Sequence, residues 1–446
     1  MWLLPALSGL SRAAARSFYR LQIVGPEVSA KGPVLLLANH PNSLLDPALV
    51  GAAAGRPVRF LAKSTLFSDS RVGWLVRGSG AIPVYRRSDD AEAASRNVQM
   101  FEAVFTELAG GAAVGIFPEG ISHSMSSLAK LKTGSARIAL GSYARVDKVF
   151  PLVPIGLVLR HKGVFRSDAL IIRGVAVDWE DLANRGVEDP EAVCELTDRL
   201  DQALREVTLN LERWEDQPLI ECAEGIWSAE MTSGGEEEEV EQVQRAQTAA
   251  RVLADFRRRG DDEWQGLARE VNAHRRRLRL LGLQPSDLDA KVDLATGAGW
   301  TVRRMPLLGP PAILVGVSGA LIFWVPYQVT DRIVRAFRPD AVQSCTYKVL
   351  VGALIYLLWI LLLTVLAWRF LGPWPALAVF LVAPFFGLVA QRIRELWRDA
   401  WSDVRRFFVL RSRREVLAQL KEEQSALATR LHDAYTEWRQ QDSAAH

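Results

Sequence analysis

Residues 34–46, VLLLANHPNSLLD, join a short apolar run to an imidazole and a carboxylate. The run 34–38 has the length and the continuous apolar character of a strand that is buried on both faces. Similar runs at 112–117 and 150–159 alternate with stretches of helical pattern up to about residue 220. This alternation predicts an α/β domain in which a mixed sheet is flanked by helices.

His40 and Asp46 follow the predicted strand directly, at the kind of position where α/β folds present catalytic groups. Pro41 keeps His40 out of helical geometry and is tolerated at a helix start, so we expect Asp46 one or two turns along a following helix, facing back. A carboxylate that holds one ring nitrogen orients the imidazole, whose other nitrogen can then accept a proton from a hydroxyl nucleophile. Taken alone, the same pair is more typical of a surface histidine near a helix-capping aspartate, and the neighbouring motifs are what favour a catalytic pair.

Two further predicted strand ends carry charged side chains. Residues 80–86 end in Arg86, and residues 116–120 end in Glu119 and Gly120, with Lys132 shortly after. Arg86 and Lys132 would supply a forked donor and a point charge for one phosphate group. Glu119 is expected to fix an arginine or a substrate hydroxyl, because a carboxylate accepts hydrogen bonds from both. Each fragment by itself is also typical of a solvated strand end or turn.

Four ordered blocks resemble those of the glycerolipid acyltransferase superfamily, which includes glycerol-3-phosphate and lysophosphatidic acid acyltransferases. The blocks are Asn39-His40 with Asp46, the strand 80–86, the run 117–120 and the run 153–156, and the resemblance covers roughly residues 15–215. Most of the superfamily has four residues between the histidine and the aspartate, whereas five separate His40 from Asp46. The longer spacing is similar to that of the fungal-type glycerol-3-phosphate/dihydroxyacetone-phosphate acyltransferases and their bacterial relatives, a branch that also carries C-terminal membrane segments.

The resemblance implies a reaction and a role for each residue. A fatty acyl group would pass from acyl-CoA or acyl carrier protein to the hydroxyl of glycerol-3-phosphate, with His40 as the general base and Asp46 as its orienting partner. The acceptor's phosphate or glycerol would be bound by Arg86, Glu119, Gly120 and Lys132. No cofactor is expected, because the thioester already supplies the driving force.

Three alternatives stay open at this point. The acceptor could be a lysophospholipid instead of glycerol-3-phosphate, or the chain could be a non-catalytic membrane scaffold that works through its charged helices. A serine nucleophile, Ser43 or Ser122, paired with His40 would predict an acyl-enzyme, although neither serine lies in a GxSxG elbow.

Three uncharged apolar segments, 305–330, 349–368 and 370–391, would each reach about 30 Å as a helix, the thickness of a bilayer's hydrocarbon core. The first is rich in proline and glycine, so we expect it to be re-entrant or interfacial. The other two are expected to form a transmembrane helical hairpin. Basic residues flank all the segments, and an even number of crossings places the active site and both termini on the cytoplasmic side.

Composition limits the classes of partner, and the patterns along the chain predict its domain organisation. The 54 basic and 51 acidic residues give a formal charge of +3, which disfavours nucleic acid and leaves membrane lipid, the acyl donor and the glycerol phosphate acceptor as expected partners. Three scattered cysteines indicate neither a metal site nor a disulfide framework. The predicted organisation is an amphipathic interfacial helix (1–20), an acyltransferase domain (21–220), a charged helical linker (221–304), membrane-embedded segments (305–391) and a helical cytoplasmic tail (392–446).

Overall fold

The computed structural model describes residues 4–70, 72–85, 93–159, 161–231, 239–260, 262–289, 309–338, 340 and 344–445. The chain divides into two compact units. The first comprises residues 1–210, 238–247 and 339–349, and the second comprises residues 211–237, 248–338 and 350–446. The first ten residues or so of the helix that starts near 239, and the first turn of the helix that starts at Ser344, therefore belong to the first unit.

The first unit is built on a sheet whose described strands are β1 (Tyr19–Val24), β2 (Val34–Ala38), β3 (Val58–Lys63), β4 (Ile82–Val84), β5 (Ala113–Ile116), β6 (Leu152–Leu159) and β7 (Ser167–Arg173). Their order is β1-β7-β6-β2-β5-β3-β4, and all neighbours are parallel except β6 and β7, which are antiparallel. The predicted mixed sheet is thereby confirmed. The apolar run 34–38 forms its centre, where β2 is buried and pairs with β5 and β6.

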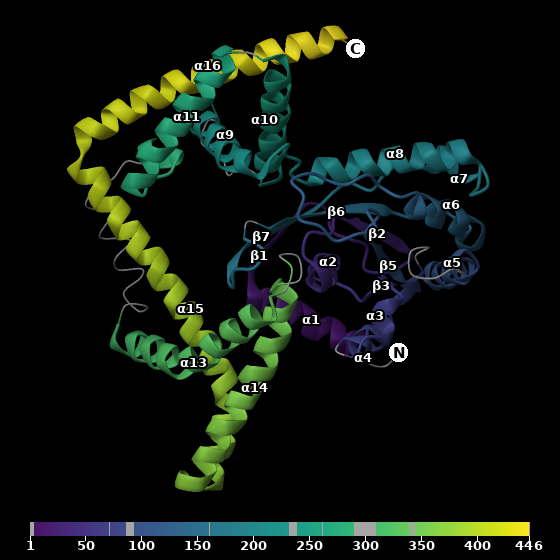
Figure 1. Cartoon of the computed structure of the whole chain (residues 1–446), viewed down its shortest axis with the longest axis horizontal. Coiled ribbons are helices and arrows are strands. Elements are labelled where there is room, and N and C mark those ends of the chain that lie inside the picture. Colours follow the sequence, from purple (N-terminus) through teal and green to yellow (C-terminus); the bar gives the residue numbers. More distant parts are fainter. Residues whose placement is uncertain are drawn as a thin grey trace. The chain divides into compact units, whose positions relative to one another are not determined.

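Helices cover both faces of this sheet. They are α1 (Leu4–Phe18), α2 (Asp46–Ala54), α3 (Thr65–Ser68), α4 (Gly73–Gly78), α5 (Ala93–Ala109), α6 (Gly134–Val146), α7 (Glu180–Ala183) and α8 (Pro190–Val207). Figure 1 shows these helices around the sheet. Because side chains alternate along a strand, Leu35 and Leu37 pack with α5, α6 and α8, whereas Val34 and Leu36 pack with α1 and α2.

Helix α1, predicted as an interfacial helix, contributes to the core of this unit at its C-terminal end. Ala15 and Phe18 are buried in the cluster that includes α2 and β2, whereas Leu10, one to two turns earlier, is 67% exposed. The C-terminal half of α1 is thus packed on the sheet, and the apolar Leu10 stays available for contact with lipid.

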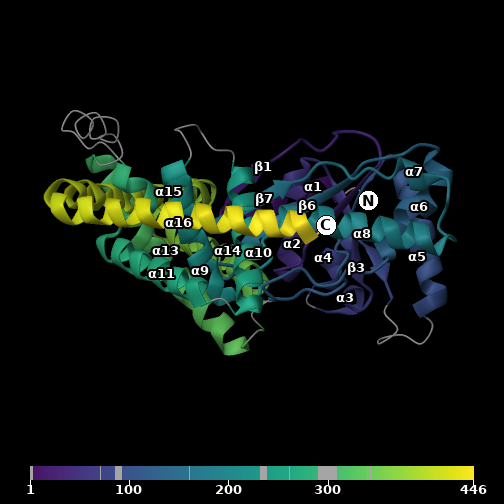
Figure 2. The ribbon, with the colours of Figure 1, turned by 90° about the horizontal axis from the view of Figure 1, so that it is seen from above.

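The second unit is helical. Its elements are η2 (Trp214–Asp216), α9 (Gln217–Met231), most of α10 (Glu239–Arg259), α11 (Asp262–Leu281), η3 (Pro285–Asp289), α13 (Pro310–Phe337), most of α14 (Ser344–Leu371), α15 (Pro373–Ser412) and α16 (Arg414–Ala445). The described parts of the charged linker and of the tail are therefore helical, as predicted. Helix α16, yellow in Figures 1 and 2, lies along α9 and α11, and their shared core consists of Cys222, Ile226, Leu267, Val271, Leu427 and Ala428.

Helices α13, α14 and α15 are each long and apolar enough to cross a membrane. The expectation of a re-entrant first segment is wrong for the described residues, since α13 is one continuous helix from Pro310 to Phe337 with Pro326 inside it. Whether this helix lies at the membrane interface stays a prediction. Pro310 and Pro311 occupy the first turn, where no backbone donor is needed. The number of crossings stays a prediction.

The predicted short connection between the second and third apolar segments is present. Only Gly372, with φ +99°, lies between α14 and α15, and α15 continues to Ser412, well past the boundary expected at residue 391. Helix α15 packs along α13 at glycines: a Cβ added at Gly319 would lie 2.2 Å from the Cβ of Ala390. Small residues at such crossings let two backbones approach closely.

Candidate active site

His40 and Glu119, two of the residues predicted to carry chemistry, lie at the carboxyl ends of neighbouring parallel strands. His40 follows β2, Glu119 follows β5, and β2 pairs in parallel with both β5 and β6. The side chain of Asn39 fixes this edge, because its amide donates to the Leu157 carbonyl of β6 (3.1 Å) and its oxygen accepts from the Leu157 amide (2.7 Å). Three loops, after β2, β5 and β6, are thereby brought to one place.

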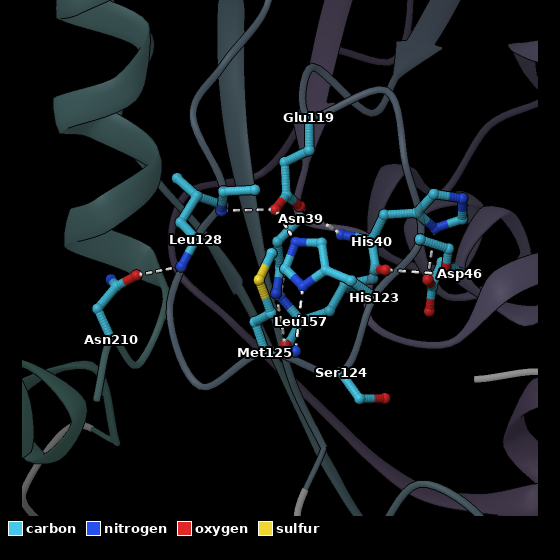
Figure 3. A network of polar contacts seen from close by, with 12 residues as sticks. Asn39, His40, Asp46, Glu119, His123, Ser124, Met125, Leu128, Leu157 and Asn210 are labelled. Atoms are coloured by element: carbon cyan, nitrogen blue, oxygen red, sulfur yellow. Dashed lines mark hydrogen bonds and ion pairs between the residues drawn. The ribbon is translucent and has the colours of Figure 1, made fainter. Parts of the chain in front are cut away.

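His40 and Asp46 form the predicted pair. His40 Nδ1 lies 2.7 Å from Asp46 Oδ2, which also accepts the backbone N–H of Asn42 at 2.7 Å (Figure 3). The helix, however, starts at Asp46 and not at Pro41, because a loop and the short 3-10 helix η1 (Ser43–Leu45) intervene. Asp46 is therefore the first residue of α2, and its side chain contacts His40 from there, with Pro47 next to it in the first turn.

The surroundings of the pair leave one imidazole nitrogen available. The His40 ring stacks on Phe117, with ring centroids 4.0 Å apart and planes inclined by 11°. An ionised Asp46 is acceptor-only, so opposite it Nδ1 carries the proton and Nε2 has the lone pair. Among the described residues no partner is recorded for Nε2, and 19% of the His40 side chain is exposed whereas Asp46 is fully buried. This is the geometry of a general base that can receive a proton from a bound hydroxyl.

Burial is the largest influence on the ionisation of Asp46, and its neighbours oppose that influence in part. Burial raises the pKa of the Asp46 carboxyl, whereas the hydrogen bonds and charge of His40, the Asn42 N–H and the Lys162 ammonium act to lower that pKa. Three groups therefore favour the ionised carboxylate that a protonated His40 needs as its partner.

Glu119 is 2% exposed, and its carboxylate is occupied by protein donors. Oε1 accepts the His40 backbone N–H at 3.0 Å, and Oε2 accepts the Ala129 N–H at 2.8 Å and pairs with His123 Nε2 (Figure 3). The Met125 N–H donates to His123 Nδ1 at 3.2 Å, so both ring nitrogens of His123 are engaged. These contacts favour Glu119 as a support of the His40 backbone, and its predicted contact with substrate stays a prediction.

His123 was missed by the reasoning from sequence. Its only signal there is its place four residues after Glu119, in the run that follows β5. Because Nε2 donates to Glu119 and Nδ1 accepts from the backbone, His123 has no lone pair left for a substrate proton. Of the two histidines in this region, His40 is the one suited to be a base.

The predicted cations are placed in part. Gly120 has φ +70°, and a Cβ there would lie 2.6 Å from Lys132 Nζ, so the Lys132 side chain lies close to the glycine, while the predicted contact of both residues with substrate stays a prediction. Arg86 lies outside the described residues. Lys162, in the loop after β6, is half-buried. Its Nζ is 3.5 Å from Ser124 Oγ, and burial lowers its pKa, whereas Asp46 and Glu119 oppose that shift.

The serines next to the motifs support the backbone. Ser122 Oγ donates to the His40 carbonyl at 2.9 Å and accepts the Ser43 N–H at 3.0 Å. Within the described residues neither hydroxyl is recorded as bonded to the His40 ring, whereas a serine nucleophile activated by this histidine would be within hydrogen-bond reach of it.

Comparison with known proteins gives concordant matches. Residues 20–158 match the family model described as Acyltransferase. Glycerol-3-phosphate O-acyltransferase 1 of Saccharomyces cerevisiae is 26% identical over 305 residues, which span 63% of this chain and 39% of the yeast protein. Glycerol-3-phosphate O-acyltransferase 2 of the same yeast is 32% identical over 134 residues, 29% of this chain and 18% of that protein. The chain thus aligns with well under half the length of these relatives.

One solved structure is also similar. It is the 1-acyl-sn-glycerophosphate (LPA) acyltransferase PlsC from Thermotoga maritima, at a TM-score of 0.34 and 20% identity over 46% of this chain and 78% of that one.

Proposed function

We propose that this chain transfers a fatty acyl group from a thioester to the hydroxyl of glycerol-3-phosphate, because residues 20–158 match the family model described as Acyltransferase and two yeast glycerol-3-phosphate O-acyltransferases are similar in sequence. The observation that carries the proposal is the His40–Asp46 pair, with Nδ1 and Oδ2 2.7 Å apart and Nε2 available. The choice of acceptor rests on the two yeast relatives, both named glycerol-3-phosphate O-acyltransferases.

In the proposed mechanism the acceptor hydroxyl gives its proton to His40 Nε2 as it attacks the thioester carbonyl. The tetrahedral intermediate then collapses, the carbon–sulfur bond breaks, and the proton passes from His40 to the leaving thiolate. Asp46 stabilises the transient imidazolium and keeps the ring in one tautomer. No acyl-enzyme forms and no cofactor is assigned, since acyl-CoA or acyl carrier protein supplies an activated acyl group.

The acceptor's phosphate needs cations beside the base. We assign Lys132 and Arg86 to this role, as predicted from their places after Gly120 and after β4, with Lys162 as a third cation close to the pair. Ammonium groups act as point charges towards phosphate, whereas an arginine adds a fork of two donors. In this proposal Lys132 binds the phosphate and takes no part in the proton transfer. Substitutions of Lys132 should therefore raise the KM for the acceptor more than they lower kcat.

The proposed location is the membrane surface, with the site on the cytoplasmic side. Ile121 and Met125, on the loop that carries Glu119 and His123, are apolar side chains that are 42% and 51% exposed, which suits contact with an acyl chain or lipid. The helices α13, α14 and α15 are able to anchor the chain there. Tags at both termini are expected to be accessible from the cytoplasm, and opposite accessibility would contradict this topology.

The test compares membranes that carry the full chain with membranes that carry His40→Ala. Labelled glycerol-3-phosphate and acyl-CoA should yield an acylated product, and the variant should lose about 10²- to 10⁴-fold in rate, or about 3 to 5 kcal/mol of barrier. His432→Ala, an exposed histidine of α16, is the matched control and should keep full activity. Activity only with a lysophospholipid would show that the acceptor is not glycerol-3-phosphate. Equal activity of wild type and His40→Ala would contradict the proposed role of His40 as the base.

A further inference from the structure

A buried polar chain leads away from the His40–Asp46 pair. Asn42, which is fully buried, donates its backbone N–H to Asp46 Oδ2 and its side-chain amide to the hydroxyl of Tyr19 at 2.7 Å. Tyr19 is the first residue of β1 and is itself fully buried. One residue, Asn42, therefore links the carboxylate that orients the base to a tyrosine hydroxyl on the other side of the loop.

The Tyr19 hydroxyl is fixed by two further partners. It donates to the Lys162 carbonyl at 2.5 Å and lies 3.4 Å from Cys345 Sγ in the first turn of α14. Burial raises the pKa of Tyr19 well above the usual value for a phenol, so the group stays protonated as a donor. Since its single proton points to the carbonyl, the oxygen accepts from Asn42, and the thiol of Cys345 is the donor in the remaining contact.

The start of α14 also holds the loop that bears Lys162. Lys348 Nζ donates to the Gly163 carbonyl at 2.7 Å, and Cys345 is fully buried in the same cluster as Leu36 and Leu49. These contacts lie within the first unit, which includes residues 339–349. The hydroxyl of Tyr19 is thus held from the β6–β7 loop and from α14 at once.

The loop from Asn39 to Asp46 needs such an anchor. Ser43 adopts φ +52°, a left-handed conformation that costs free energy in a residue with a Cβ. Asp46 Oδ1 is buried with no recorded partner in the described part of the chain, so the two contacts of Oδ2 alone set the orientation of the carboxylate. Ser122 holds the loop on one side, and the Tyr19–Asn42 hydrogen bond holds it on the other.

We propose that Tyr19 is a positioning residue: its hydroxyl fixes Asn42 and, through the Asn42 backbone N–H, the Asp46 carboxylate that orients His40. Its kinetic consequence rests on the acyl transfer proposed above. The geometric consequence, an ordered Nδ1–H···Oδ2 hydrogen bond, does not depend on the identity of the acceptor.

The kinetic test uses the full chain in membranes with Tyr19→Phe. The expected result is a kcat about tenfold lower with KM for both substrates within about twofold of wild type, because the lost hydrogen bond touches no substrate. Tyr143→Phe is the matched control: this α6 tyrosine packs on Trp179, and no hydrogen bond of its hydroxyl is recorded among the described residues. Tyr143→Phe should leave both kcat and KM unchanged.

Asn42→Ala tests whether Tyr19 acts through Asn42. It also replaces Tyr19→Phe in the kinetic test if that variant does not fold. If Tyr19 acts through Asn42, the double variant should be no slower than Asn42→Ala alone, since the two effects share one route. Independent, multiplying effects would show that Tyr19 acts elsewhere and would overturn the proposal.

A spectroscopic readout separates this proposal from the proposed function. The low-field proton resonance of His40 Nδ1–H, assigned by its loss in His40→Ala, should broaden or shift in Tyr19→Phe and in Asn42→Ala but not in Tyr143→Phe. Wild type that acylates no acceptor would defeat the proposed function, while this resonance would still decide the role of Tyr19. An unchanged resonance and kcat in Tyr19→Phe, or a raised KM at constant kcat, would overturn the proposal.

Discussion

Glu119→Gln tests whether this residue supports the backbone of the base or contacts the substrate. The carboxylate of Glu119 receives three donors: the His40 N–H on Oε1, and the Ala129 N–H and the His123 ring on Oε2. Glutamine has one oxygen, so its NH₂ must face at least one donor. The least costly orientation keeps the oxygen towards Ala129 and His123 and turns the NH₂ towards the His40 N–H.

The expected loss of stability follows from these contacts. One buried hydrogen bond to a charged group is lost and two donors are brought together, which should lower the free energy of unfolding by about 2 to 4 kcal/mol. For a unit of this size the melting temperature should fall by about 4 to 12 °C. Because the His40 backbone is then released, kcat should fall about 10- to 100-fold while KM for glycerol-3-phosphate changes little.

The assay measures the melting temperature and steady-state kinetics of the detergent-solubilised chain. Glu102→Gln is the control: Glu102, on α5, pairs with Arg145, its side chain is 52% exposed, and its loss should change stability by no more than about 0.5 kcal/mol. An unchanged melting temperature together with a raised KM for Glu119→Gln would refute this reasoning and would indicate that Glu119 contacts the substrate.

Asp46→Asn should lower kcat by about 10³- to 10⁴-fold, as expected when an amide in place of a carboxylate favours the wrong imidazole tautomer. Burial raises the pKa of Asp46, so folding favours the protonated carboxyl, and the stability of the wild-type protein falls as pH rises from the ordinary value of 3.8 through the raised one. The melting temperature of Asp46→Asn, measured relative to wild type, should therefore rise over that pH range. A difference in melting temperature that does not depend on pH would contradict this. Gly120→Ala combines a positive φ with a collision with the Lys132 chain, so kcat/KM should fall about tenfold or more, whereas Gly266→Ala in α11, with open space around it, should be silent in the same kinetic assay.

Much of the site was predictable because its signals are local. The continuous apolar run 34–38 predicts a buried strand whatever surrounds it, and His40 comes at the end of that strand, where a parallel sheet presents functional groups. The order and spacing of the blocks around His40, Glu119 and Gly120 then indicated an acyltransferase, which the comparisons support.

Other features of the site depend on the strand order and on the loop packing of the folded chain. The start of α2 at Asp46 depends on the turn held by Ser122, and the partners of Glu119 depend on how the loop after β5 folds back to Ala129. Lys162 is half-buried near the base because β6 lies next to β2 in the sheet, an order that no local pattern contains.

One long-range contact joins Tyr19 to Cys345, which are 326 positions apart. Hydrophobic periodicity reports on neighbours within a few turns or strand positions, so it predicts a helix at α14 and a strand at β1 but not their meeting. Sequence alone therefore predicted the central strand and the pairing of His40 with Asp46, both of which the structure shows. Tertiary structure alone decided which buried donors hold Asp46, because hydrogen bonds between distant segments depend on strand order and packing.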